Sequence, residues 1–196
     1  MYSAMKQEWK ELIIYHMRRK SNRMYKKIMD AEVERKKGFK SMDDIYSFEK
    51  KYNILLPEEY EEFLLNYGSG YIKADYCYTA LENTPLTPES GYQSVDYFYG
   101  SDIVGNMDVF LEELNGQLLP IADAGGGDFI CIGVKDEYKW KVYYWMHEGK
   151  SSVLGDNLYL IANTFGEFIK RFEERSLETE IDLDDVELIL DDDLLD

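Results

Sequence analysis

Two histidines and a small group of carboxylates are the residues best suited to chemistry in this 196-residue chain. His147 and Glu148 follow an aromatic stretch, while Asp123 and Asp128 flank three consecutive glycines at 125–127. A histidine beside two or three carboxylates can bind a metal ion or act as a general acid and base. The simpler alternative is a histidine at the end of a strand, hydrogen-bonded to a carboxylate in a neighbouring turn.

The motifs that accompany catalysis do not surround these residues. The other histidine, His16, has no second histidine four residues away, and no serine or cysteine stands in a nucleophile-elbow motif. The glycines at 125–127 are not followed by the lysine and Ser/Thr of a phosphate-binding loop, so a tight turn between strands explains them better. Cys77 and Cys131 show neither metal-ligand spacing nor a disulfide pattern. We therefore expect no enzyme activity, no metal and no cofactor.

Charge is unevenly distributed along the chain. The whole chain carries a net charge of −17, but residues 1–40 hold 12 Lys/Arg against 5 Asp/Glu, a net of +7. Residues 41–196 hold 10 against 34, a net of −24. An acidic body disfavours direct binding of nucleic acid, because phosphates must be neutralised by cationic groups. It favours a basic protein partner, although acidity that serves solubility alone is an equally simple explanation.

The apolar segments are short. No run is long enough to cross a bilayer, and the first forty residues lack the apolar core of a secretory signal. The two cysteines fit a reducing compartment. We expect a cytoplasmic protein that does not enter a membrane.

Residues 57–70 form the most complete local pattern. Pro57 suits the first helical position, acidic residues follow in the first turn, and Gly68 supplies a left-handed stop. One apolar stripe occupies positions i, i+3, i+4 and i+7: Tyr60, Phe63, Leu64 and Tyr67. The pattern predicts a short helix with one buried face.

Two further helices and a pair of strands can be placed around it. Ser41 and Asp44 form a capping box for a preceding helix. The run 129–134 reads as a buried strand, and 141–145 returns as its hairpin partner. A last helix begins at Thr164, with Glu167 completing a second capping box and with a buried face made of Phe165, Phe168, Ile169 and Phe172.

The two ends of the chain differ from this body. Residues 1–40 form a basic helical extension, which either packs on its own domain or binds an external partner. Residues 176–196 form an acidic tail with ten carboxylates and no basic residue. Such a tail is either solvated or folds on a basic surface.

Four blocks in this order resemble the SUKH superfamily, the group of Smi/Knr-like domains. Residues 56–70 are similar to the helix that opens such domains. Residues 119–132, with Pro120-Ile121-Ala122 and Gly127-Asp128, are similar to their strand–turn–strand signature. Residues 141–148 resemble their strand ending in Trp and His-Glu, and 165–169 their closing helix. Met146, where a carboxylate is common, and Ser69, where a glycine is frequent, depart from the pattern.

This resemblance implies an α+β fold, a twisted and mostly antiparallel sheet with helices packed against it. We expect a SUKH-like domain over 41–175, between the 1–40 extension and the 176–196 tail. Bacterial members are mainly immunity proteins that neutralise a cognate toxin by occlusion, which suits an acidic chain and a basic nuclease partner. The alternative that the resemblance implies is a regulatory scaffold that binds cell-wall or signalling proteins.

Candidate contact residues come from the segment 71–106, which is rich in glycine, proline, serine and tyrosine and has weak periodicity. Tyrosines anchor protein interfaces, and carboxylates steer a basic partner. We expect the following to be exposed and to bind the partner: Asp75, Tyr76, Tyr78, Glu82, Tyr92, Asp96, Tyr97, Tyr99 and Asp102.

Overall fold

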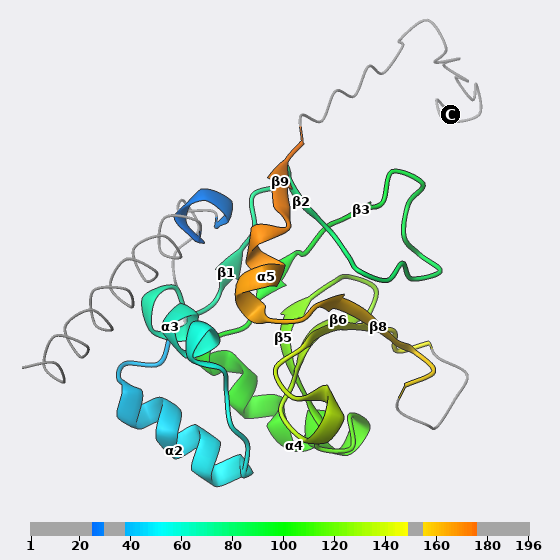
Figure 1. The fold of residues 1–196 in the computed structure, drawn as a ribbon. Coiled ribbons are helices and arrows are strands. Elements are labelled where there is room, and N and C mark those ends of the chain that lie inside the picture. The colour runs from blue at the N-terminus through cyan, green and yellow to red at the C-terminus, as the bar shows by residue number, and fades with distance from the viewer. Residues whose placement is uncertain (1–24, 30–37, 149–154, 176–196) are drawn as a thin grey trace, which may run out of the picture.

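The computed structural model describes residues 25–29, 38–148 and 155–175 (Figure 1). The helices are α2 (Met42–Tyr52), α3 (Glu58–Asn66), α4 (Met107–Glu113) and α5 (Phe165–Lys170), with short 3-10 turns η1 (Ser101–Asn106) and η2 (Asp136–Tyr138). The strands are β1 (Gly70–Tyr71), β2 (Tyr76–Thr79), β3 (Tyr92–Gln93), β4 (Tyr97–Phe98), β5 (Leu118–Asp123), β6 (Phe129–Gly133), β7 (Val142–Trp145), β8 (Leu158–Ala162) and β9 (Phe172–Glu174).

Six strands form the main sheet in the order β1-β4-β5-β6-β7-β8, and every neighbouring pair is antiparallel. A second sheet has the order β3-β2-β9 and is also antiparallel. The strand predicted at 129–134 and its hairpin partner at 141–145 are β6 and β7. The predicted α+β architecture is therefore confirmed.

The helix ends follow the capping residues. Ser41 Oγ accepts a hydrogen bond from Asp44 N at 3.3 Å, and Asp44 Oδ2 accepts one from Lys40 N at 3.0 Å. Thr164 Oγ1 accepts from Glu167 N at 3.0 Å and so begins α5. The bonds from Asp44 N and Glu167 N satisfy N–H groups that a first helical turn leaves without partners.

Helix α3 begins one residue later than predicted. Pro57 has extended backbone angles (φ −73°, ψ 142°), and its carbonyl accepts hydrogen bonds from Tyr60 N and Glu61 N. It is therefore the N-cap rather than the first helical residue. The predicted end is confirmed, because Gly68 has φ 63°.

The predicted apolar stripe of α3 is the centre of the core. Phe63 is fully buried, and its ring centroid lies 5.1 Å from that of Phe98 in β4 and 5.4 Å from that of Phe165 in α5. Tyr60, Leu64 and Tyr67 are also buried. Helices α3 and α5 thus pack against one face of the main sheet (Figure 1).

Part of the N-terminal extension belongs to this core. Tyr25 and Ile28 are buried, and the Tyr25 ring centroid lies 5.4 Å from that of Phe63. Ile28 O accepts a hydrogen bond from Lys73 N, and Met29 forms a bridge with Ile72. Residues 25–29 therefore pack on their own domain. The rest of the basic extension and the acidic tail lie outside the described residues.

The opposite face of the main sheet carries a smaller apolar cluster. Leu118, Cys131, Tyr143 and Trp145 point to this side and meet Leu114, which follows α4 directly. Phe110 of α4 packs on Phe129, with ring centroids 5.3 Å apart. Helix α4 covers this face at one end.

Candidate functional site

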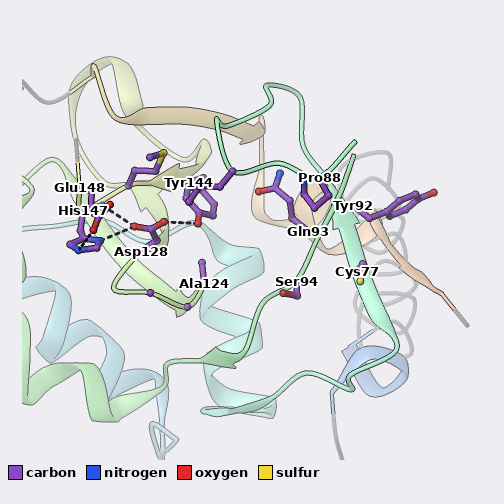
Figure 2. A pocket seen from close by; sticks show the side chains of 14 residues that line it. Cys77, Pro88, Tyr92, Gln93, Ser94, Ala124, Asp128, Tyr144, His147 and Glu148 are labelled. Atoms are coloured by element: carbon purple, nitrogen blue, oxygen red, sulfur yellow. Dashed lines mark hydrogen bonds and ion pairs between the residues drawn. The ribbon is translucent and has the colours of Figure 1, made fainter. Parts of the chain in front are cut away.

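The chemically suggestive residues of the sequence meet at the turn between β5 and β6. Asp128 is 5% exposed, and its Oδ2 accepts a hydrogen bond from Tyr144 Oη at 2.7 Å. Its Oδ1 accepts from His147 N at 2.9 Å and lies 3.1 Å from His147 Nδ1 (Figure 2). Burial and the bond to the carboxylate both raise the pKa of Tyr144.

The sequence explains this arrangement locally. Gly125, Gly126 and Gly127 all have positive φ, between 62° and 92°, which is conformational space that other residues enter with strain. Asp123 Oδ1 accepts from Gly125 N at 2.8 Å and closes the turn. The turn brings Asp128 back beside the end of β7, where Tyr144 and His147 stand.

This geometry assigns Asp128 a structural role. Its two oxygens are engaged by the phenol and by His147, so the carboxylate ties the glycine turn to β7. His147 is 42% exposed, and its Nε2 lies 4.0 Å from Glu148. In the described part of the chain no group of three or more His, Cys, Asp or Glu residues is placed to hold a metal ion.

A cleft of about 590 Å³ adjoins this cluster. Asp128, His147 and the glycine turn line one wall, while Tyr92 and Gln93 of β3 line the other (Figure 2). Gln93 is 9% exposed, and its Nε2 has no hydrogen-bond partner among the described residues. Sequence reasoning missed Gln93, because nothing in its neighbourhood distinguishes it from an ordinary strand residue.

Two of the nine candidate contact residues are buried. Tyr78 is fully buried in β2, where its ring meets Phe168 and Phe172 at 5.2 and 5.6 Å between centroids. Tyr76 is 4% exposed, and its hydroxyl donates to Glu174 Oε2 at 2.8 Å. The expectation of exposure was wrong for both, because β2 lies between β3 and β9 and its alternate side chains face α5 and the core.

Four other candidates are spread over separate places. Asp75 O accepts from Arg175 N, and Tyr92 Oη donates to Glu173 Oε2 at 3.1 Å, so both border β9. Glu82 hydrogen-bonds to Leu160 on the outer edge of β8, through its own N–H and its carboxylate. Asp96 is exposed beside the glycine turn. These residues do not form one patch.

The remaining three candidates do come together. Tyr97 Oη donates to Asp102 Oδ2 at 2.9 Å, and the ring centroids of Tyr97 and Tyr99 lie 5.8 Å apart. Both tyrosines are half-buried. Sequence reasoning missed their neighbour Tyr71, whose ring centroid is 4.9 Å from that of Tyr97 and which is 50% exposed. The two-residue spacing of Tyr97 and Tyr99 was the available signal that both share a face.

Comparison with known proteins places this fold. The model of the SMI1 / KNR4 family (SUKH-1) matches residues 41–171. The chain belongs to this family. It is also 30% identical over 156 residues to the SPbeta prophage-derived uncharacterized protein YokK of Bacillus subtilis (strain 168), a match that covers 71% of this chain and 79% of that protein.

Family membership indicates the general kind of function. SUKH domains are commonly toxin-immunity domains and typically non-catalytic, and they pair with toxin partners. Among the described residues, no helix is both long enough and apolar enough to traverse a lipid bilayer.

Proposed function

We propose that this chain is an immunity protein of the SUKH type, which binds a cognate toxin in the bacterial cytoplasm and blocks it by occlusion. The observation that carries the proposal is the family match over residues 41–171. The net charge of −17 favours a basic toxin, such as a nuclease, because opposite fields accelerate association.

The proposal assigns the chain no catalytic role. The histidine–carboxylate cluster that suggested chemistry, Asp128 with His147, ties the glycine turn to the end of β7. A His147→Ala variant is therefore expected to protect cells as well as the unchanged protein does. Loss of protection in a variant that folds normally would favour an enzyme instead.

The direct test is co-expression with the toxin encoded beside this gene. The expected result is restored growth of cells that produce the toxin, together with a stable complex of the two purified proteins. Failure to restore growth and failure to form a complex would reject the proposal. A regulatory scaffold of the Smi/Knr kind is the second candidate, and absence of a toxin gene next to this one would favour it.

A further inference from the structure

One face of the main sheet carries a continuous row of side chains across its strands. The strand registers align Tyr71 with Tyr97, Tyr97 with Asp123, Asp123 with Phe129, and Phe129 with Trp145. Residues paired in this way point to the same face of an antiparallel sheet. The row therefore runs from β1 to β7 and, with Tyr99, is called here the aromatic row.

Ring contacts hold this row in place. Centroids are 4.9 Å apart for Tyr71 and Tyr97, 6.3 Å for Tyr99 and Phe129, and 5.7 Å for the stacked pair Phe129 and Trp145. Aromatic side chains held by their neighbours lose little conformational entropy on binding, which is why they anchor interfaces. The row is a preorganised surface.

Exposure along the row is graded. Trp145 is 8% exposed and Tyr71 50% exposed, with Tyr97, Tyr99 and Phe129 between them. Helix α4 packs on the row at Phe129, through Phe110. The half of the row nearest β1 is thus open, while the other face of the same sheet is packed against α3 and α5.

The open half is acidic as well as aromatic. Asp123 lies within the row, and Asp102 is bonded to the Tyr97 hydroxyl at 2.9 Å. Burial raises the pKa of Tyr99, and the charges of Asp123 and Asp102 raise it further. The surface therefore carries two carboxylates beside its aromatic rings.

Such a surface matches one kind of occupant. A protein segment that presents arginine or lysine can bind both the carboxylates, through charged hydrogen bonds, and the faces of the tyrosine rings, because cations are attracted to aromatic faces. Nucleic acid is disfavoured by the same charges. We propose that the aromatic row, from Tyr71 to Phe129 with Asp102, is the docking face for an Arg- or Lys-bearing segment of the partner protein.

This inference rests on the proposed function, and its test uses the purified product of the adjacent toxin gene as the probe. Tyr71→Ala removes the most exposed ring of the row, and Tyr46→Ala on α2 is a matched control because Tyr46 is 54% exposed. We expect the first change to raise Kd about tenfold or more and the second to leave it unchanged.

A second pair tests the charge. Asp102→Asn removes a carboxylate that also accepts a hydrogen bond from Gly100 N, and Asp44→Asn removes one that accepts from Lys40 N in the same way. Asp102→Asn should slow association about threefold or more, with no such effect for Asp44→Asn. Thermal unfolding of all four variants checks that each is folded.

The outcomes separate the two proposals. Weaker binding by the row variants than by their controls supports the docking face. Equal binding by all four folded variants overturns the docking face and leaves the immunity function standing. No binding by the unchanged protein overturns both.

Discussion

The Glu59 carboxylate accepts a hydrogen bond from Gly166 N at 2.9 Å, although the two residues are 107 positions apart in the sequence. Glu59 lies in the first turn of α3, and Gly166 in the first turn of α5. The contact joins the two helices at their amino-terminal ends, where a negative charge is stabilised by free N–H groups. It locks together the pair of helices that covers the core face of the sheet.

Loss of this contact should weaken the fold. Glu59→Gln is expected to lower the free energy of unfolding by about 1 kcal/mol, because a charged acceptor becomes a neutral one. Urea unfolding measures the effect, with Glu89→Gln in an exposed loop as the control.

The same contact brings Glu59 close to the Cα of Gly166. A Cβ at Gly166 would overlap the Glu59 carboxylate. Gly166→Ala should therefore displace the Glu59 carboxylate and lower the free energy of unfolding. In the double variant with Glu59→Ala, the loss of unfolding free energy should be smaller than the sum of the two single losses, by about 0.5 kcal/mol or more. Strict additivity in this double-mutant cycle would contradict the proposed clash.

Asp128 is expected to be the most sensitive carboxylate of the glycine turn. Asp128→Ala leaves the hydroxyl of Tyr144 and the N–H of His147 without their acceptor and should cost about 2–3 kcal/mol. Tyr144→Phe removes one donor only and should cost about 1 kcal/mol. Denaturant unfolding gives both values, and an equal loss for the two variants would argue against Asp128 as the shared acceptor.

Gly133 stands where no side chain fits. A Cβ there would overlap the backbone carbonyl of Tyr138, and this backbone is held by a bond from Trp140 N to Gly133 O at 2.7 Å. Gly133→Ala should lower the free energy of unfolding by about 2 kcal/mol or more. Gly105→Ala, where nothing lies within 4 Å of the new Cβ, should change it by less than about 0.5 kcal/mol. Thermal melts of the two variants compare them directly.

Glu167 makes part of the stability depend on pH. The hydrogen bond from Arg171 lowers the pKa of Glu167, burial opposes it, and bonds from Asn163 add to the lowering. A carboxylate whose pKa is lowered by folding stabilises the fold above its unfolded pKa near 4.5, and this contribution is lost as the pH falls through the folded value.

The corresponding variant should show this loss. Since the Glu167 side chain is 34% exposed, Glu167→Gln is expected to cost only about 0.5 kcal/mol at pH 7. The difference from the unchanged protein should shrink as the pH falls below the unfolded pKa of Glu167 and through its lower folded pKa. Unfolding curves at pH 7 and at a series of lower pH values measure it, and a difference that did not shrink would mean that the charge is not its source.

Salt should act mainly on the encounter with the partner. If the acidic body steers a basic toxin, raising the ionic strength slows association strongly and changes dissociation less, because screening acts before contact. Stopped-flow mixing with the toxin at two salt concentrations tests this. An unchanged association rate would count against the acidic surface as the binding face.

Patterns of short range predicted the local elements well. The caps at Ser41 and Thr164, the stripe around Phe63 and the stop at Gly68 all depend on neighbours within one or two helical turns. The hydrogen bond between His147 and the turn carboxylate Asp128 was also predictable, because the two residues lie next to the paired ends of the hairpin formed by β6 and β7. Interactions between residues that are close in the sequence can be predicted from local residue types and their spacing.

The candidate contact residues were harder to predict. Tyr78 and Tyr97 have similar surroundings in the sequence, yet one is fully buried beneath α5 and the other lies on the open face of the main sheet. Strand periodicity shows which residues share a face, but not which face another element will cover. That depends on partners such as α5 and β9, which lie about ninety residues further along the chain.

The sequence by itself determined helices α2, α3 and α5, the central hairpin, the glycine turn and the family, because each depends on local spacing and residue type; helix α4 was not predicted. Only the tertiary structure decided which tyrosines stay at the surface and that Tyr71, Tyr97, Asp123 and Phe129 form one row. The row is built from four strands, of which only β5 and β6 are close in the sequence, and strand order and register align them. No pattern within a single strand carries that information.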